Sequence, residues 1–304
     1  MCCVRPFAAS APRFHPFSNV GRLEGILGKM QEYPYCDPGS CPGRAENGAG
    51  HLEKPHVVAV GGLDPSGGAG LVRDLLTAEA LGARAMLIGT AWTRQDESGV
   101  EGVEPRAPDM VRAALIHALA GCPPRRTAVK IGMVAGVGIA AAIVSGLEGW
   151  QGPVVLDPVL RASGGGLLFA GVPSDLIPLV RRATLVTPNL LEAAWLTGLA
   201  VETLDQARHA AQALAEWGPS AVLVKGGHLS GPATDVLRCP AGERLYEGTR
   251  VPGKSPRGTG CALATAIAVE LAGGQPLEQA VAAAKAWLAG RIQVAVAIGN
   301  ARYL

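Results

Sequence analysis

From Pro55 onward, short apolar runs of strand length alternate regularly with longer amphipathic stretches. Because each short run is followed by a segment with apolar residues at helical spacing, the pattern predicts repeated β–α units. Such repetition is typical of an α/β fold with a mainly parallel central sheet and helices on both faces. We therefore expect a single domain over residues 55–304. The predicted strands are 57–60, 85–89, 129–133, 154–156, 184–186 and 221–224, with helices at 71–81, 111–118, 137–147, from 190, and 204–217.

Residues 1–54 have a different composition, rich in Pro, Gly, Cys and Arg and without apolar periodicity. We interpret them as a poorly ordered N-terminal extension. The scarcity of acidic residues weakly resembles an organelle transit peptide, and a start at Met30 or later is the simpler interpretation. Four of the seven cysteines lie here, at spacings that match no zinc pattern: Cys2, Cys3, Cys36 and Cys41.

Composition excludes several classes of partner. A formal net charge of +2 with only 4% aromatic residues argues against nucleic-acid binding. We expect no membrane insertion, because no apolar run reaches about 18 residues. The remaining cysteines, Cys122, Cys239 and Cys261, are too few for a disulfide framework, so a reducing cytoplasm fits best.

Small residues lead directly into an Ala-rich helical run at Gly258-Thr259-Gly260-Cys261. Glycines allow successive backbone N–H groups to converge on one point, and the following helix start favours anionic oxygen. The segment therefore predicts a phosphate cradle. Taken alone, it could equally be a turn in which Thr259 caps the helix.

A second glycine-rich loop, residues 61–70, follows the first predicted strand. Its position before a helix suggests a dinucleotide-binding fingerprint. However, Pro65 and the loop length break the required glycine spacing, so dinucleotide binding is a weak interpretation.

Polar residues follow three predicted strands: Asp157, the segment Thr187-Pro188-Asn189, and Lys225. The carboxyl ends of parallel strands meet at one edge, where ligands bind. Asp157 and Glu192 are the oxygen ligands that a nucleotide-bound Mg²⁺ needs, and Lys225 could neutralise phosphate charge. Individually, each carboxylate could be a helix cap or surface charge, and Lys225 could simply pair with a carboxylate. Together with the cradle they point to phosphoryl transfer.

The chain resembles the hydroxymethylpyrimidine/phosphomethylpyrimidine kinases of the ribokinase-like superfamily over nearly all of residues 56–295. Six motifs occur in the family's order: Asp64-Pro65-Ser66-Gly67-Gly68-Ala69-Gly70, Lys130-Ile131-Gly132-Met133, Val155-Leu156-Asp157-Pro158-Val159, Thr187-Pro188-Asn189-Leu190-Leu191-Glu192-Ala193, Val224-Lys225-Gly226-Gly227-His228-Leu229 and Gly258-Thr259-Gly260-Cys261.

The resemblance implies an ATP- and Mg²⁺-dependent kinase whose pyrimidine lies against four residues: Asp74, Gln95, Met133 and Val159. Thr187, Asn189 and Lys225 would bind the nucleotide, and Asp157 and Glu192 the metal. An amide such as Gln95 offers both the donor and the acceptor that an aminopyrimidine edge requires. Without the resemblance, Gln95 would be an ordinary loop residue and Met133 core filler.

By the same resemblance, Cys261 occupies the place where sugar kinases of this superfold carry an aspartate base. A helix N-terminus favours a thiolate, so Cys261 could accept the substrate hydroxyl proton, or it could only position that hydroxyl.

The chain departs from the family's usual residues at four places. Arg257 replaces a His, Ala262 a Thr, and Leu63 a Ser or Thr, while Arg94-Gln95-Asp96-Glu97 replaces Ala-Gln-Asn-Thr. These changes leave the strictness of pyrimidine selection open. A pyridoxine or pyridoxal kinase is the first alternative, and a non-catalytic ligand sensor the second. We also expect a homodimer, as is common for apolar α/β kinases of this size.

Overall fold

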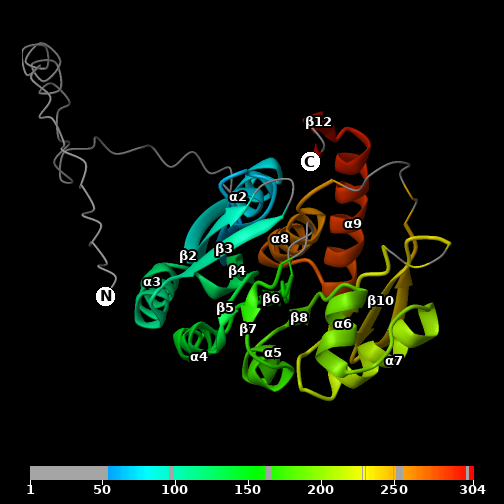
Figure 1. The fold of residues 1–304 in the computed structure, drawn as a ribbon, viewed down its shortest axis with the longest axis horizontal. Coiled ribbons are helices and arrows are strands. Elements are labelled where there is room, and N and C mark those ends of the chain that lie inside the picture. The colour runs from blue at the N-terminus through cyan, green and yellow to red at the C-terminus, as the bar shows by residue number, and fades with distance from the viewer. Residues whose placement is uncertain are drawn as a thin grey trace, which may run out of the picture. The chain divides into compact units, whose positions relative to one another are not determined.

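The computed structural model describes residues 54–95, 99–161, 166–227, 229, 231–248, 250, 256–298 and 301–304 (Figure 1). Residues 52–304 form one compact unit. The predictions for residues 1–53, and those for Asp96, Glu97 and His228, lie outside the described residues.

A nine-stranded sheet forms the centre, in the order β11-β10-β9-β8-β6-β4-β1-β2-β3. The pairings from β9 through β8, β6, β4 and β1 to β2 are parallel, while β3, β10 and β11 join antiparallel at the two sides. The predicted mainly parallel sheet is confirmed. Its strands are β1 His56–Leu63, β2 Arg84–Gln95, β3 Val100–Pro105, β4 Thr127–Ile131, β6 Val154–Leu156, β8 Leu185–Val186, β9 Val222–Val224, β10 Asp235–Cys239 and β11 Gly242–Tyr246.

Helices cover both faces of this sheet, as the β–α alternation predicts (Figure 1). One face carries α3 Pro108–Ala120, α4 Val137–Gly146, α5 Ile177–Arg181, α6 Leu190–Thr197 and α7 Leu204–Ala215. The other carries α2 Gly70–Ala80, α8 Thr259–Ala272 and α9 Leu277–Gln293. Short 3₁₀ turns at Pro124–Arg126 and Pro173–Leu176 connect some of these elements.

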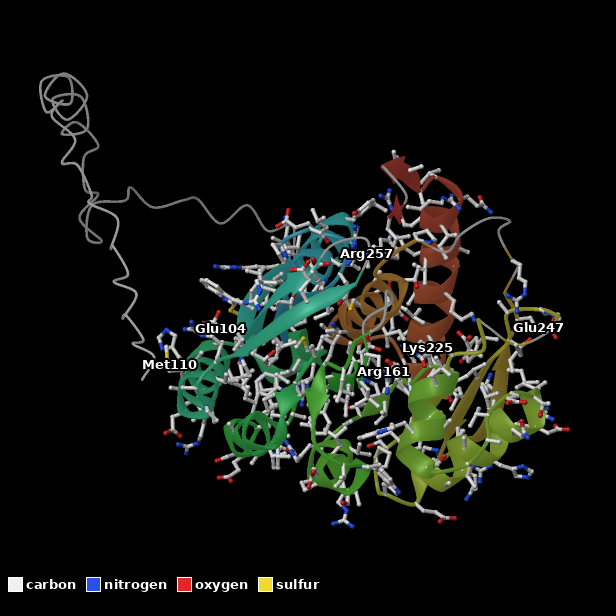
Figure 2. All side chains as sticks on the ribbon, in the orientation of Figure 1. Glu104, Met110, Arg161, Lys225, Glu247 and Arg257 are labelled. Atoms are coloured by element: carbon white, nitrogen blue, oxygen red, sulfur yellow. The ribbon has the colours of Figure 1, made fainter. Side chains whose placement is uncertain are left out.

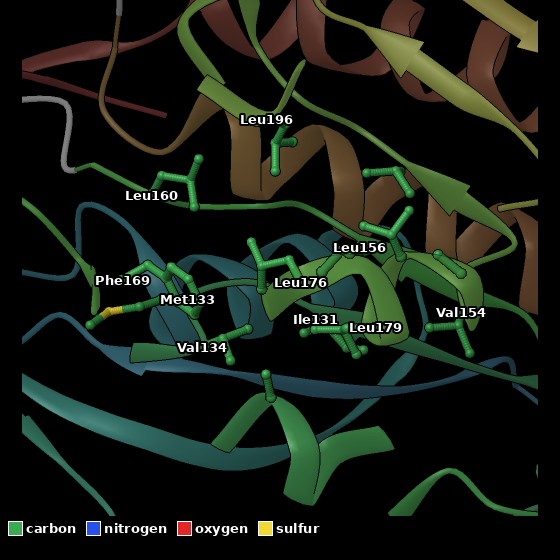
Figure 3. Packing of buried hydrophobic residues seen from close by; sticks show 14 of the residues in the cluster. Ile131, Met133, Val134, Val154, Leu156, Leu160, Phe169, Leu176, Leu179 and Leu196 are labelled. Atoms are coloured by element: carbon green, nitrogen blue, oxygen red, sulfur yellow. The ribbon is translucent and has the colours of Figure 1, made fainter. Parts of the chain in front are cut away.

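Each face has its own hydrophobic core. The larger one joins the α3–α7 layer to the sheet through branched and aromatic side chains such as Leu156, Leu179 and Phe169 (Figure 3). The other is built around α8, whose alanines 262, 264, 266 and 268 are fully buried. Alanine favours helix and has little bulk, so α8 packs closely on the sheet and presents its first turn at the sheet's carboxyl edge.

Several elements were not predicted from the sequence. They are β3, the short helix α5, the β10–β11 hairpin, helix α9, and two small sheets formed by β5 Ala135–Gly136 with β7 Phe169–Ala170 and by β12 Val296–Ile298 with β13 Ala301–Tyr303. Strand β2 also continues past Gly89 to Gln95. None of the helices in the described part of the chain is both long and apolar enough to span a bilayer.

Candidate active site

An ion pair stands at the carboxyl edge of the sheet, where Lys225 follows β9 and Asp157 follows β6. The Lys225 Nζ atom lies 2.7 Å from Asp157 Oδ1, and the two side chains are 13% and 2% exposed. Burial, the largest single effect, lowers the pKa of Lys225, but the charges of Asp157 and Glu192 and the hydrogen bond to Asp157 together outweigh it, so that the pKa is raised. Lys225 is therefore a cation that Asp157 fixes in place and that remains partly accessible from the carboxyl edge of the sheet.

Strand β8 lies between these two strands and supplies the segment that joins them. Thr187 Oγ1 donates to Asp157 Oδ1 at 3.3 Å, and the Lys225 amide donates to the Pro188 carbonyl at 2.8 Å. Asn189 pairs with Lys225 in a parallel bridge. The predicted nucleotide-binding residues Thr187, Asn189 and Lys225 thus lie at one place.

Glu192 caps the helix that follows. Its Oε2 accepts from the Asn189 amide at 2.7 Å, and Asn189 Oδ1 accepts from the Glu192 amide at 2.9 Å, which is a capping box. The helix-cap interpretation of this carboxylate is confirmed. Burial raises the pKa of Glu192 to about 7. The positive charge of Lys225 lowers this pKa and the negative charge of Asp157 raises it, so the three groups interact electrostatically.

The predicted cradle adjoins the same pair. Gly258 is the residue before α8, with φ +76°, and a Cβ there would collide with the Gly68 carbonyl oxygen. Residue 258 must therefore be glycine. Because Gly258 is the N-cap and Thr259 is already the first helical residue, the alternative in which Thr259 caps the helix is wrong. A Cβ on Gly260 would lie 3.3 Å from Lys225 Nζ. The first amides of α8 and the Lys225–Asp157 pair consequently share one site.

Cys261 stands in the first turn of α8 and is 9% exposed. Burial raises the pKa of its thiol to about 11, and the nearby Lys130 ammonium offsets only part of that effect. This direction is opposite to the expectation that the helix N-terminus favours a thiolate, and burial is its largest cause. At neutral pH this thiol carries its proton.

Three of the four residues expected around a pyrimidine lie at the carboxyl ends of strands β2, β4 and β6, and β1 separates β2 from β4. Gln95 is the half-buried last residue of β2. Met133 follows β4, is 6% exposed, and packs against Gly62. Val159 follows β6 and lines a small cavity of about 10 Å³ together with Gly132.

Asp74 is placed differently from its prediction. It is fully buried in α2, and both its carboxylate oxygens accept from Lys130 Nζ at 2.8 Å. One of them also accepts from Thr265 Oγ1 at 2.8 Å. The carboxylate is thus covered and bonded inside the protein, which contradicts a direct contact between Asp74 and the substrate ring.

The two glycine-rich loops are joined by Asp64 and Arg257. Asp64 accepts from the amides of Ser66 and Ala69 at 2.9 and 3.0 Å, and from the Arg257 guanidinium at 3.2 Å. Figure 2 shows Arg257 and Lys225 close to the α8 helix. The arginine that precedes the cradle therefore also holds the first loop in place.

The family model described as phosphomethylpyrimidine kinase matches residues 64–303. The chain belongs to this family. The hydroxymethylpyrimidine/phosphomethylpyrimidine kinase of Rhizobium meliloti is 40% identical over 81% of this chain and 94% of its own length, and that of Streptomyces coelicolor is 38% identical over 81% and 91%.

Solved structures agree with this assignment to the phosphomethylpyrimidine kinase family. The crystal structure of phosphomethylpyrimidine kinase from Clostridium difficile matches with a TM-score of 0.68 and 33% identity, covering 79% of this chain and all of that one. A pyridoxal kinase from Staphylococcus aureus in complex with AMP-PCP and pyridoxal matches with a TM-score of 0.73 and 27% identity, over 83% and 93%. The fold is ribokinase-like, and the protein is a kinase that uses ATP.

One buried lysine at this kinase site was not given a role from the sequence. Lys130 interrupts an otherwise apolar strand, Thr127–Ile131, and is fully buried. A charged residue inside such a run indicates a buried partner, so the strand pattern could have revealed that Lys130 is paired, although not with which residue.

Proposed function

We propose that this kinase phosphorylates the hydroxymethyl group of 4-amino-5-hydroxymethyl-2-methylpyrimidine and then phosphorylates the resulting monophosphate, giving the pyrophosphate for thiamine biosynthesis. The observation that carries the proposal is the Lys225–Asp157 pair beside Gly260, directly at the uncapped start of α8. The names of the related kinases supply the substrate.

The phosphoryl group would be held by charge and by backbone amides. Amides at the start of α8 bind the anionic oxygens of the transferred group, and Lys225 neutralises charge on the same oxygens. Cys261 lies in this helical turn, where its protonated thiol can hydrogen-bond the acceptor hydroxyl. Holding both reactants at one place supplies much of the rate enhancement.

Asp157 and Glu192 fit a site for Mg²⁺. Both are buried carboxylates, and the negative charge of Asp157 raises the pKa of Glu192. A divalent cation bound between them would lower that pKa again, because it favours the charged form of both carboxylates. Because Glu192 also caps α6, it would reach the ion through water, as Mg²⁺ commonly allows. When bound, the metal would neutralise charge on the nucleotide phosphates.

The acceptor would lie between residues at the carboxyl ends of β2, β4 and β6. Gln95 would hydrogen-bond the amino group and ring nitrogen of the pyrimidine, while Met133 and Val159 supply apolar contacts. Asp74 is not part of this contact set, because its carboxylate is sealed against Lys130.

The direct test is product analysis with purified protein, ATP, Mg²⁺ and the pyrimidine alcohol. We expect both the monophosphate and the diphosphate, each resolved by chromatography and mass. ATP consumption without either product would exclude the proposal, and a complete lack of transfer would favour the sensor alternative.

A pyridoxal kinase is the second candidate, because the Staphylococcus aureus enzyme has a TM-score of 0.73 to this chain. Parallel assays with the pyrimidine alcohol and pyridoxal separate the two. Gln95→Leu should lower kcat/KM for the aminopyrimidine by about 10- to 100-fold, because an unpaired polar edge is costly. We expect a smaller loss for pyridoxal. An equal loss for both would remove Gln95 as the selecting residue.

A homodimer is our proposal for the assembly. Leu76 on α2 and Leu87 and Trp92 on β2 are 49%, 43% and 57% exposed, an apolar group near the β2–β3 side of the sheet. Mass measurement by light scattering should give twice the chain mass, and Leu87→Glu with Trp92→Glu should give monomers.

We further propose that the protein works in the cytoplasm without a nucleic-acid partner, in keeping with its free cysteines 122, 239 and 261 and near-neutral charge.

A further inference from the structure

Arg73 lies near the start of α2 and forms no ion pair with a carboxylate of the described residues. It is nevertheless only 6% exposed. Its Nη1 donates to the Leu304 carbonyl oxygen at 3.0 Å, and its Nη2 donates to the Gly67 carbonyl oxygen at 3.4 Å. A buried charge is costly unless hydrogen bonds satisfy it, so these two carbonyls determine where the guanidinium lies. Arg73 therefore connects the glycine-rich loop after β1 to the residue that follows β13.

The stem of the same side chain packs against the predicted cradle at residues 258–261. A Cβ on Gly258 would lie 3.1 Å from Arg73 Cγ, and it would also collide with the Gly68 carbonyl oxygen. The N-cap of α8 thus contacts both Arg73 and the loop to which Arg73 is bonded. One side chain therefore links three segments that are far apart in the sequence.

Strand β13 contacts the same two loops through its backbone and through one ring. The Arg257 amide donates to the Arg302 carbonyl at 2.9 Å, and Arg257 pairs with Tyr303 in a parallel bridge. A Cβ on Gly68 would lie 3.1 Å from Tyr303 Cε1, so the ring packs against that glycine. Arg302 Nη2 in turn donates to the Ile292 carbonyl at 3.2 Å. The last turn of α9 therefore supports β13, and Figure 1 shows the end of the chain beside this helix.

The spacing between the two glycine-rich loops matters for the reaction. Backbone amides stabilise charge that develops on a phosphoryl group only when they stand within about 0.5 Å of the productive position. Residues 64–69 form turns and bends without helix or strand, so this loop does not fix its own distance from α8. The Asp64–Arg257 ion pair is one connection between the loops, and Arg73 with residues 302–304 is a second.

We propose that Arg73 and residues 302–304, together named the β13 clasp, hold the first amides of α8 at the spacing that phosphoryl transfer requires. Arg73 is then a positioning residue that acts through hydrogen bonds and packing, and not through contact with the substrate. The inference rests on the proposed function in one respect, namely that the amides of α8 bind the transferred phosphoryl group.

Steady-state kinetics of the full chain tests the β13 clasp with two variants. Arg73→Met keeps an apolar stem and removes both hydrogen bonds, whereas Tyr303→Ala removes the ring that packs on Gly68. We expect kcat to fall about tenfold in Arg73→Met and about threefold in Tyr303→Ala, because misplaced amides lose interactions made in the transition state. KM for ATP and for the pyrimidine alcohol should change less than about twofold. An unchanged kcat in Arg73→Met would overturn the proposal.

A conservative variant separates hydrogen bonding from charge. Arg73→Lys keeps the positive charge but lacks the planar fork that reaches two carbonyls, so we expect it to recover less than half of the lost kcat. A wild-type kcat in Arg73→Lys would assign the effect to charge and contradict the clasp.

A double variant and a matched control complete the kinetic test. Arg73→Met/Tyr303→Ala should resemble Arg73→Met alone, because both substitutions break the same connection, and effects that multiply would overturn the clasp. Arg126 Nη1 also donates to a backbone carbonyl beside α8, that of Gly273 at the opposite end of the helix. Arg126→Met should therefore leave kcat unchanged. A similar fall in Arg126→Met would mean that any loosening of α8 lowers activity.

Hydrogen exchange measured by mass spectrometry gives a readout that needs no substrate. Arg73→Met and Tyr303→Ala should accelerate exchange at least about twofold in peptides covering residues 61–70 and 256–262, and should leave a peptide from α7 unchanged. Unchanged exchange in both loop peptides would overturn the clasp even if kcat falls, and faster exchange in α7 as well would indicate general destabilisation instead. If Arg73→Met does not fold, Tyr303→Ala decides by the same two measurements.

The two proposals can fail separately. A wild-type chain that does not phosphorylate the pyrimidine would end the proposed function and leave the exchange result standing. An active kinase whose loops exchange normally in both variants would end only this inference.

Discussion

Two of the lysine–aspartate pairs in the described part of the chain have similar N···O distances and different surroundings. Lys130–Asp74 and Lys225–Asp157 have N···O distances of 2.8 and 2.7 Å. The first pair is completely covered, whereas the second is 13% and 2% exposed. Only the second can exchange its partner for an incoming phosphate. Access from the sheet edge, and not pairing distance, therefore decides which lysine can bind a ligand.

The cover over each pair comes from its neighbours. Thr265 of α8 bonds to Asp74, and Gly132 packs against the Lys130 ammonium, which closes that site. Beside Lys225 lies Gly260, which has no side chain to fill the space. A side chain at residue 260 would meet Lys225 at 3.3 Å and obstruct the path to it.

Breaking the accessible pair should have the largest effect on activity. We expect Lys225→Met to lower kcat by about 100- to 1000-fold, because a cation that stabilises the transferring phosphoryl group is lost. Steady-state assays with ATP and the pyrimidine alcohol measure this, with Lys225→Arg as the charge-preserving control. A loss of less than about fivefold in Lys225→Met would contradict the role given to Lys225.

Breaking the sealed pair should instead have the largest effect on stability. Lys130→Met leaves Asp74 buried without its cation, which costs about 3–5 kcal/mol of unfolding free energy. Urea unfolding of Lys130→Met and of the double variant Lys130→Met/Asp74→Asn tests this. The double variant should recover much of the loss, since no unpaired charge remains. Equal losses in both would show that the charge is not the cause.

How far the sequence predicts these features depends on the range of the interaction. The inner strands follow from apolar runs such as Val57–Val60, and the strand-end residues Asp157 and Lys225 follow from parallel topology. The β10–β11 hairpin was missed because β11, Gly242–Tyr246, has three consecutive exposed residues and no apolar run. The local pattern there gives little sign of a strand.

The Asp74–Lys130 pairing lay beyond sequence reasoning for a different reason. The partners are 56 residues apart, and their contact depends on which face of β4 is turned toward α2. The capping box at Asn189 and Glu192, by contrast, is a three-residue spacing that the sequence displays directly. Burial of Cys261, which reverses the expected effect of the helix N-terminus, also needs the whole fold.

The pH dependence of stability sharpens the description of the accessible pair, because Glu192 adjoins it. Its pKa in the folded protein is about 7, above the usual 4.5. The folded state therefore binds this proton more tightly, and the resulting stabilisation is complete below about pH 4.5 and lost as the pH rises through 7. Glu192→Gln should lack this dependence, with a difference from wild type on the order of 1–3 kcal/mol between pH 5 and 7.5.

Urea unfolding at a series of pH values, without Mg²⁺, measures this difference. Asp205→Asn is a suitable control, because Asp205 is 81% exposed and pairs with Arg208 of its own helix. Parallel curves for wild type and Glu192→Gln would show that Glu192 titrates normally.

A third pair extends the comparison and should give the smallest effect. Lys285 of α9 lies 2.5 Å from Asp235, whose other oxygen accepts from the Gly226 amide at 2.8 Å. Gly226 directly follows Lys225, and a Cβ on Gly226 would collide with the Thr234 carbonyl, so the turn is closely packed.

Lys285 thus supports Lys225 indirectly, because it holds Asp235 and Asp235 bonds the neighbouring Gly226 amide. Because Lys285 bonds to Asp235 and acts on Lys225 only through it, Lys285→Met should raise KM for ATP about three- to tenfold and leave kcat and KM for the pyrimidine nearly unchanged, while Lys285→Arg should restore the wild-type value. A fall in kcat with unchanged KM for ATP would instead place Lys285 with the sealed pair, as a support of α8 and not of the nucleotide side.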